Sequence, residues 1–336
     1  MDKIKVGIVG YGTIGKRVAD AVRQQKDMEL IGVTGRSYSY KMVVAHQKGI
    51  PIYFSENRDE FVNNNIPVAG DINDLLKEVD IIVDCTPKKI GKVNKEKYYL
   101  PKKVKAIFQG GEKPDVAEVS FVAQCNYNEC IGKDYIRVPS CNTTGLCRTL
   151  HTINQRYKIK EVHATMIRRA ADPWDIYHGP INAIVPVLEL PSHHGPDVRT
   201  VLHGLEIFTT AISVSTTLMH MHNLIVLCEQ EPDREEAIKL FENTTRVRVV
   251  DNASKIRSTA QVIEFARDLG RLRGDMPEII VWREGIGTYN SRLLYMQAIH
   301  QESDVIPENI DAIRAAMGFE DGEKSIKITN ESLGIK

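Results

Sequence analysis

The stretch Ile4-Lys5-Val6-Gly7-Ile8-Val9-Gly10-Tyr11-Gly12-Thr13-Ile14-Gly15 opens the chain and decides the class of fold. Its β-branched first half predicts a buried strand, and apolar residues at helical spacing follow it at positions 18, 19 and 22. Gly10, Gly12 and Gly15 therefore lie between a strand and a helix, where a dinucleotide-binding loop needs them. Gly10 allows the tight turn, Gly12 lets backbone amides approach a pyrophosphate, and Gly15 lets helix and strand pack closely. An ordinary glycine turn is the alternative.

Short strand-like runs alternate with helical stretches through the rest of the N-terminal half. Strands are expected at 29–34, 81–85 and 106–109, and helices at 72–77 and 93–100. This alternation is typical of an α/β fold with a Rossmann-type doubly wound parallel sheet. Ligands of such sheets bind at the carboxyl ends of the strands, so Thr86-Pro87 and Gly110-Gly111 are expected to line the cofactor crevice.

The end of the second strand bears on the choice of cofactor. An NAD site usually has Asp or Glu there, which binds the ribose 2′-hydroxyl. This chain has Gly35-Arg36-Ser37 instead, with no carboxylate. Arg36 could bind a 2′-phosphate, which favours NADP or the use of both NADP and NAD; an exposed loop arginine is the alternative.

A single cysteine stands at the junction Pro139-Ser140-Cys141-Asn142-Thr143-Thr144-Gly145, between a strand-like run at 135–138 and a helix expected from Leu146 onward. Amides at a helix N-terminus favour a thiolate over a thiol, so Cys141 is a candidate nucleophile for acyl chemistry. The alternative is that Ser140 or Asn142 caps the helix and Cys141 is a small buried filler.

After Cys141 the pattern changes to alternating extended runs at 162–167, 201–208, 224–227 and 246–250. These runs predict a catalytic α+β domain with a mostly antiparallel sheet. A helix is expected at 307–317, with Pro307 at its start. We therefore expect a dinucleotide-binding domain at 1–140, a catalytic domain at 141–302 and a C-terminal helical segment at 303–336 that returns to the first domain.

The second half also carries the polar candidates. A long irregular segment at 168–197 is expected to be functional, to contact another subunit, or both. Arg168-Arg169 could bind a phosphate or form an internal ion pair. His193-His194 lacks partners at metal-ligand spacing, so we expect hydrogen bonds to a polar substrate and no metal site. Along a strand at 216–222 both histidines would face one side and both methionines the other, and His220 or His222 could supply the base that a thiol needs.

Composition excludes several classes of function. The 336 residues carry 44 Lys and Arg against 44 Asp and Glu, so no global field favours nucleic acid. No apolar segment is long enough to span a bilayer, and no signal-peptide pattern is present, so a cytoplasmic protein without a membrane partner is expected. The six cysteines show no CxxC pair and are expected to be reduced thiols.

Several further motifs must be considered together with the glycine loop and the Cys141 junction. They are Phe108-Gln109-Gly110-Gly111-Glu112-Lys113, Arg168-Arg169-Ala170-Ala171-Asp172, Gly179-Pro180-Ile181-Asn182, Pro191-Ser192-His193-His194, Thr216-Thr217-Leu218-Met219-His220-Met221-His222 and His300-Gln301-Glu302-Ser303-Asp304. In their order and spacing they closely resemble the archaeal-type phosphorylating glyceraldehyde-3-phosphate dehydrogenases. The resemblance covers nearly the whole chain.

The resemblance implies a homotetramer that oxidises glyceraldehyde 3-phosphate with NAD or NADP and inorganic phosphate, a reaction of glycolysis and gluconeogenesis. It implies that Cys141 is the nucleophile and His220 the general base. Substrate contacts are implied for Ser140, Asn142, His193 and His194, with Arg168 a candidate for binding phosphate. Cofactor contacts are implied for Thr13, Ile14, Gly111, Arg169 and Gln301.

Two positions depart from the family pattern. Many relatives have Asn where this chain has Val9, and the family often has a Lys with Thr where this chain has Gly35-Arg36. Both positions belong to the cofactor site. The alternatives in function are a related semialdehyde or acyl-phosphate reductase and a catalytically silent dinucleotide-binding module.

Overall fold

The computed structural model describes residues 2–109, 111–173, 175 and 178–335. The chain forms two compact units: unit 1 is Met1–Ser140 with Ile306–Gly334, and unit 2 is Cys141–Val305 with the last two residues. Unit 2 thus extends past position 302, where the sequence suggested a boundary. Within the described ranges, no helix combines the length and apolar character that crossing a bilayer requires.

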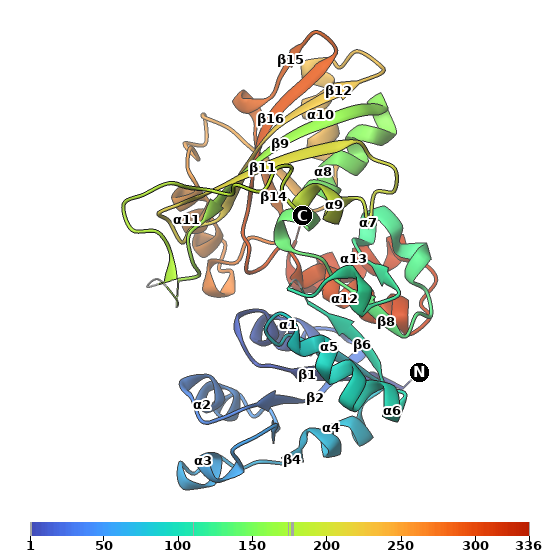
Figure 1. The fold of residues 1–336 in the computed structure, drawn as a ribbon, viewed down its shortest axis with the longest axis vertical. Helices are drawn as coiled ribbons and strands as arrows, with labels where there is room; N and C mark the ends of the chain where they lie inside the picture. The colour runs from blue at the N-terminus through green and yellow to red at the C-terminus, as the bar shows by residue number, and fades with distance from the viewer. Residues whose placement is uncertain (1, 110, 174, 176–177, 336) are drawn as a thin grey trace. The chain divides into compact units, whose positions relative to one another are not determined.

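Unit 1 is built on an eight-stranded sheet in the order β4-β3-β2-β1-β5-β6-β8-β7, in which every pairing is parallel (Figure 1). The chain runs outward from β1 in one direction and then returns to add β5 on the other side, so the strand order reverses at β1. This arrangement confirms the predicted doubly wound parallel sheet. The strands are β1 (Ile4–Val9), β2 (Met28–Gly35), β3 (Ile52–Phe54), β4 (Gly70–Asp71), β5 (Ile81–Asp84), β6 (Lys105–Phe108), β7 (Val119–Ser120) and β8 (Tyr135–Arg137).

Helix α1 (Thr13–Arg23) follows β1 after the glycine turn. Its buried residues include Val18, Ala19 and Val22, the three apolar residues that occur at helical spacing in the sequence. Gly10 has a φ of +90°, and a Cβ on Gly15 would lie 2.0 Å from the carbonyl oxygen of Gly10. The turn and the close packing therefore both require glycine. The other helices of unit 1 are α2 (Tyr40–Gln47), α3 (Arg58–Asn63), α4 (Ile72–Glu78), α5 (Ile90–Asn94), α6 (Leu100–Lys102), α7 (Ala123–Asn126), α12 (Ile306–Ala316) and α13 (Gly322–Leu333).

The buried side chain of Arg314 holds the C-terminal helices to the N-terminal part of unit 1. Its guanidinium donates to the Asp27 carboxylate at 2.7 and 2.9 Å, to Gln25 Oε1 at 2.8 Å and to Thr329 Oγ1 at 2.7 Å. Gln25 and Asp27 lie in the turn between α1 and β2, and Thr329 lies in α13. Arg314, in α12, therefore joins the neighbouring helix α13 to a turn that is 287 residues away along the chain at Asp27.

We expect Arg314→Met to lower the free energy of unfolding of the protein by about 3 kcal/mol, because it leaves buried polar partners without their charge-assisted donor. Urea denaturation followed by circular dichroism measures this change. The control is Arg267→Met, whose partner Glu264 is largely exposed. That variant should change stability by less than about 0.5 kcal/mol, and equal effects of the two substitutions would contradict the role given to Arg314.

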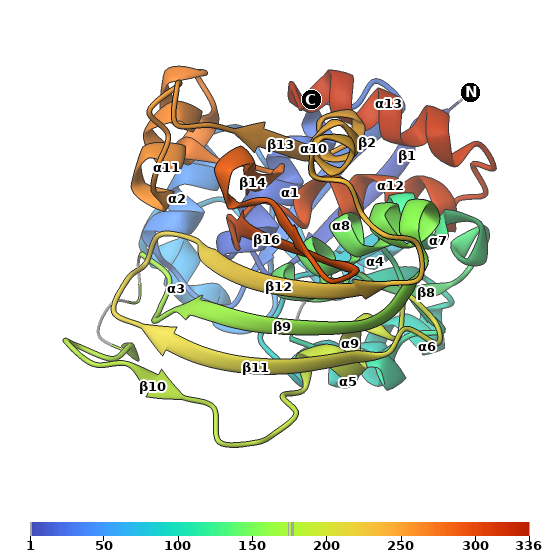
Figure 2. The same cartoon turned by 90° about the horizontal axis from the view of Figure 1, so that it is seen from above.

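Unit 2 contains a second eight-stranded sheet, ordered β10-β11-β9-β12-β16-β14-β13 with β15 paired to β16. The pairs β11–β9 and β13–β14 are parallel and the other five are antiparallel, which confirms the mostly antiparallel prediction. Figure 2 shows β12, β9 and β11 curving side by side. The strands are β9 (Ile159–Arg169), β10 (Val185–Pro186), β11 (Ile207–Val214), β12 (His220–Cys228), β13 (Val247–Val250), β14 (Ile279–Trp282), β15 (Gly287–Tyr289) and β16 (Arg292–Ile299).

Two sequence-based expectations for unit 2 are corrected. The strand expected at 201–208 begins only at Ile207, as β11. The segment before it is not extended, and Val198, Val201 and Leu205 are buried there at helix-like spacing. The helix expected from Leu146 begins already at Cys141, so the cysteine is part of its first turn. The helices of unit 2 are α8 (Cys141–Tyr157), α9 (His194–Val198), α10 (Arg234–Asn243) and α11 (Thr259–Asp268).

Candidate active site

Cys141 is the first residue of α8 and is half-buried, directly after the half-buried Ser140. Two side chains from elsewhere in unit 2 hold the first turn of this helix. His222 Nε2 lies 2.9 Å from Asn142 Oδ1, and Thr143 Oγ1 donates to Asp197 Oδ2 at 2.5 Å. The position of Cys141 is thus determined by β12 and α9 as well as by α8 itself.

The pKa of the Cys141 thiol is raised to about 12. Burial is the largest cause and the carboxylate of Asp304 adds to it, while Arg169, the backbone N–H of Asn142 and Arg168 act in the opposite direction. The raised pKa contradicts the sequence-based expectation of a favoured thiolate. Loss of hydration outweighs the helix N-terminus and the two arginines.

We expect Asp304→Asn to lower the pKa of Cys141 by about one unit, since it removes a negative charge that opposes thiolate formation. The pH at which iodoacetamide alkylates Cys141 at half its maximal rate should fall accordingly. Arg169→Gln should shift this pH upward, because it removes a positive charge. Asp115→Asn, at an exposed carboxylate of unit 1, is the control without effect. Shifts of the same sign in the first two variants would contradict this electrostatic account.

The two arginines at the end of β9 differ in their partners. Arg169 Nη2 and Nε donate to Asp172 Oδ1 at 2.8 and 3.1 Å, and Gln301 Nε2 reaches the same oxygen at 3.4 Å. Arg169 thus forms an internal ion pair, which was one of the two roles considered for the arginines from the sequence. The Nε of Arg168 is buried and has no hydrogen-bond partner among the described residues, and its charge acts on Cys141 and on His194. Arg168 is therefore the arginine that can bind an anion.

His220 and His222 begin β12 and are both buried on one face of it, as predicted from strand periodicity. Only half of the prediction for the methionines is correct: Met221 faces the other side, but Met219 precedes the strand with a φ of 67°. Both ring nitrogens of His222 are engaged, one by Asn142 Oδ1 and the other by Gln297 Nε2 at 3.1 Å. Burial and His194 lower the pKa of His222 to about 3.

His220 uses only one ring nitrogen within the described part of the chain. Its Nδ1 accepts from the backbone N–H of Arg169 at 3.0 Å. Burial, Arg169, His222 and Arg168 together hold the pKa of His220 well below its usual value, so the ring is neutral. Because Nδ1 is the acceptor, the ring hydrogen sits on Nε2, which is the nitrogen left for a ligand. Spacing could not distinguish the two histidines, whereas their partners do.

His193 and His194 stack on each other with ring centroids 4.2 Å apart. His193 is exposed, while His194 is buried and its Nδ1 lies 2.9 Å from Ser192 Oγ. Burial, His193 and Arg168 lower the pKa of His194 to about 3. His194 therefore adds a neutral hydrogen-bonding ring near Arg168, not a second positive charge.

The sequence predicted no metal site, but the structure brings the possible ligand atoms of Asp275, His300 and Glu302 within 4.8 Å of one another. His300 Nδ1 already lies 2.7 Å from Ser303 Oγ. Asp275, His300 and Glu302 therefore form a cluster of possible ligand atoms that the sequence analysis did not identify.

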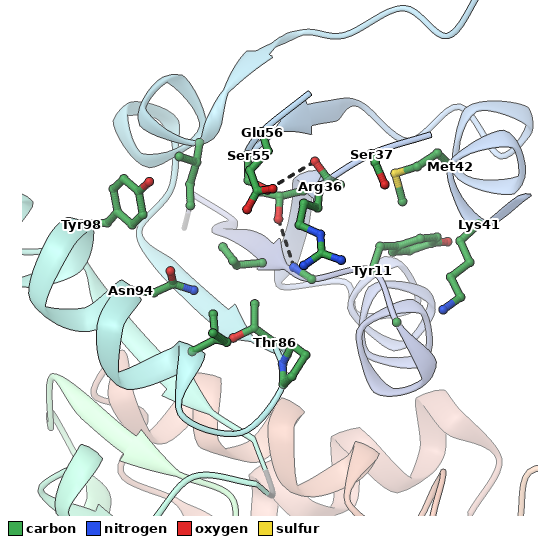
Figure 3. A pocket seen from close by; sticks show the side chains of 18 of the residues that line it. Tyr11, Arg36, Ser37, Lys41, Met42, Ser55, Glu56, Thr86, Asn94 and Tyr98 are labelled. Atoms are coloured by element: carbon green, nitrogen blue, oxygen red, sulfur yellow. Dashed lines mark hydrogen bonds between the residues drawn. The ribbon is translucent and has the colours of Figure 1, made fainter. Parts of the chain in front are cut away.

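Unit 1 contains a pocket of about 550 Å³ at the carboxyl ends of β1, β2 and β5. Gly10 and Gly12 line it, together with Arg36 and Thr86-Pro87 (Figure 3). Thr13 and Ile14 form the first residues of α1, and no side chain caps that N-terminus. Its amides can therefore receive a pyrophosphate, and the residues present fit a dinucleotide.

The other predicted cofactor residues lie elsewhere. Gly111 is exposed and is absent from the lining of this pocket, and Gly110 lies outside the described residues. Arg169 and Gln301 belong to unit 2, where Asp172 binds both side chains. Asp172 was not among the residues predicted for the site, although it stands three residues after Arg169 in one of the motifs.

Comparison with known proteins agrees with these features. A family model described as glyceraldehyde 3-phosphate dehydrogenase, C-terminal domain, matches residues 140–284, and one described as dihydrodipicolinate reductase, N-terminus, matches residues 4–109. The glyceraldehyde-3-phosphate dehydrogenase of Pyrococcus furiosus is 55% identical over 335 residues, which cover 99% of both chains. Those of Sulfurisphaera tokodaii and Methanococcoides burtonii are each 50% identical over 338 residues, covering all of this chain and 98% and 100% of their own. The chain therefore belongs to the glyceraldehyde-3-phosphate dehydrogenase family.

Proposed function

We propose that this protein oxidises glyceraldehyde 3-phosphate to 1,3-bisphosphoglycerate with NAD(P) and inorganic phosphate, and that Cys141 is the nucleophile. Family membership supports glyceraldehyde 3-phosphate as the substrate. The observation that carries the chemistry is that unit 2 contains a thiol at the start of a helix, a half-buried arginine whose Nε is buried, and a neutral buried histidine. The charge of Arg168 acts on both Cys141 and His220. A nucleophile, an anion-binding cation and a proton acceptor are the groups that this reaction needs.

In the proposed reaction the sulfur of Cys141 adds to the aldehyde carbon while the π bond of the carbonyl opens. The proton that the thiol loses passes to the aldehyde oxygen, which gives a thiohemiacetal. The hydrogen that Nε2 of His220 carries can stabilise the negative charge that develops on the aldehyde oxygen. NAD(P), when held by Gly10, Gly12 and Arg36 of the unit 1 pocket, would supply the hydride acceptor for the former aldehyde carbon. The hydroxyl proton leaves the substrate in the same oxidation. Phosphate attacks the resulting thioester, the acyl phosphate departs, and the sulfur of Cys141 is restored.

His220 has to accept the hydroxyl proton during the oxidation step. To accept it at Nε2, the ring must first carry its hydrogen on Nδ1 and give up the bond from the Arg169 amide. With this change of tautomer, His220 donates a hydrogen bond from Nε2 during the addition and accepts a proton at Nε2 during the oxidation. Arg168 is our candidate for binding phosphate, because its buried Nε has no protein partner among the described residues. Ser140, Asn142, His193 and His194 are proposed to contact the substrate.

The test is the initial rate of reduced cofactor formation from glyceraldehyde 3-phosphate, with and without inorganic phosphate. We expect a rate that requires phosphate and is lost on alkylation of Cys141. A rate without phosphate would indicate a non-phosphorylating dehydrogenase. No rate with this substrate but turnover of a semialdehyde would indicate a related reductase, and no turnover at all would leave a silent binding module.

The pocket of unit 1 favours NADP as the preferred form of the cofactor. Its lining includes the cations Arg36, Lys41 and Lys97 against a single carboxylate, Glu56. Figure 3 shows Arg36 pointing into the pocket, with Ser37 and Ser55 in the same lining. No carboxylate follows β2, where an NAD site would hold the ribose 2′-hydroxyl. We propose that Arg36 binds the 2′-phosphate, and that Gly10, Gly12, Thr13, Ile14, Gly15, Gly111, Arg169 and Gln301 contact other parts of the cofactor.

We expect Arg36→Ala to weaken NADP binding about tenfold or more, because a charge-assisted hydrogen bond to phosphate is lost, and to leave NAD binding nearly unchanged. Glu56→Gln is the matched variant, since removing the lining carboxylate should strengthen NADP binding. Dissociation constants from cofactor titration measure both effects. Equal loss of NAD and NADP affinity in Arg36→Ala would contradict the 2′-phosphate assignment.

We further propose that the protein forms a homotetramer through apolar surface of unit 2. Five exposed apolar side chains lie in one segment around β10, with exposed fractions from 48% to 86%: Ile181, Ile184, Val185, Leu188 and Leu190. A monomer rarely leaves such a cluster in water, so a second copy is the occupant that we expect. Light scattering after gel filtration should give four times the chain mass, and a smaller mass for the double variant Ile184→Asp with Leu188→Asp.

A further inference from the structure

A chain of hydrogen bonds runs through the interior of unit 2 and ends beside the candidate nucleophile. Tyr295 Oη donates to Thr149 Oγ1 at 3.0 Å, and Thr149 donates to Gln297 Oε1 at 2.9 Å. Gln297 Nε2 lies 3.1 Å from His222 Nδ1, and His222 Nε2 lies 2.9 Å from Asn142 Oδ1. All of these residues are at most 4% exposed. The reaction as described above uses only Asn142, which directly follows Cys141.

The direction of each bond in this chain follows from the one before it. Gln297 Oε1 accepts the hydroxyl of Thr149, so the NH2 group of Gln297 faces His222 and must donate to Nδ1. The ring of His222 therefore carries its hydrogen on Nε2 and donates it to Asn142 Oδ1. The amide of Asn142 consequently turns its own NH2 group away from His222.

The NH2 group of Asn142 has no hydrogen-bond partner among the described residues, and the backbone N–H of the same residue already lowers the pKa of Cys141. If the Asn142 carboxamide could rotate by half a turn, it would present either its NH2 donor or its oxygen acceptor to the reacting group. Only the donor stabilises an oxygen that gains negative charge when sulfur adds to the aldehyde. A fixed amide therefore has a direct use in the reaction.

We propose that His222 is a positioning residue of this site, which together with Gln297 and Thr149 holds the Asn142 amide with its NH2 group available to the substrate oxygen. The proposal rests on the function proposed above for Cys141. It assigns to the second histidine of β12 a role distinct from that of His220. His222 transfers no proton in the reaction, because both of its nitrogens remain in the chain.

The test compares His222→Leu with His222→Gln. Leucine removes the donor, whereas the amide of glutamine can still donate to Asn142 Oδ1. We expect His222→Leu to lower kcat about 100-fold with little change in KM, as for the loss of one oxyanion donor. His222→Gln should recover most of this loss. Wild-type kcat in His222→Leu, or equal loss in both variants, would overturn the proposal.

A second measurement does not depend on activity. Nitrogen NMR of histidine-labelled protein should show His222 as a neutral ring with its hydrogen on Nε2 from weakly acidic to weakly alkaline pH. A hydrogen on Nδ1, or a charged ring at neutral pH, would overturn the proposal. Thr149→Val does not alter the residues of the His222–Asn142 contact, but it should release the Gln297 amide. We then expect a mixture of the two neutral tautomers of His222. A tautomer ratio unchanged from the wild type would contradict the proposed chain of hydrogen bonds.

Failure of this proposal can be separated from failure of the proposed function. If Cys141→Ser is inactive while His222→Leu is fully active, the thiol chemistry stands and only the positioning role is lost. If Cys141→Ser keeps its activity, the proposed function itself is wrong.

Discussion

Cys141→Ser is expected to lower kcat by about 10⁴-fold or more while the affinity for NAD(P) stays nearly unchanged. Serine keeps the shape of the side chain, but its alkoxide is far harder to form than a thiolate. The covalent route through a thioester is therefore lost. The cofactor pocket lies in unit 1 and is lined without Cys141, so binding should survive. Steady-state kinetics and cofactor titration of the same preparation give both quantities.

The control for this variant is Cys125→Ser, a half-buried cysteine of unit 1. It should keep wild-type kcat and remain sensitive to alkylation. Full activity of Cys141→Ser would end the assignment of this residue. Loss of activity in both variants would point to a general sensitivity of the fold to cysteine replacement.

His220→Gln is expected to lower kcat between about 10²- and 10⁴-fold, because an amide cannot accept the proton released in the oxidation step. Glutamine keeps a polar side chain of similar size, so the bond from the Arg169 amide can be retained. KM for glyceraldehyde 3-phosphate should change much less than kcat. A pre-steady-state burst of reduced cofactor in the wild type, and its loss in the variant, would place the defect at oxidation.

The control is His163→Gln, at an exposed position of β9 where the ring contacts Glu161 and Phe208. It should leave kcat unchanged. Wild-type kcat in His220→Gln would exclude this residue as the base. Since burial holds the pKa of both His220 and His222 below the usual value, neither should add a protonation step near neutral pH in the wild type.

Features that depend on short stretches of chain could be predicted from the sequence. The glycine loop after β1, the alternation that builds the parallel sheet, and the shared face of His220 and His222 are consequences of local geometry with periods of a few residues. The resemblance of the ordered motifs to glyceraldehyde-3-phosphate dehydrogenases was confirmed by relatives that align over the full chain. These properties were determined by the sequence alone.

Tertiary structure decided which candidate group has which partners. His222 is hydrogen-bonded to Asn142 and Gln297, which lie 80 and 75 residues away along the chain. Arg169 forms an ion pair with Asp172. The Nε of Arg168 has no hydrogen-bond partner among the described residues. The pKa of Cys141 was predicted in the wrong direction because burial and the charge of Asp304 are invisible in a local motif. Hydration and charge depend on everything that folds around a group, so only the folded chain determines them.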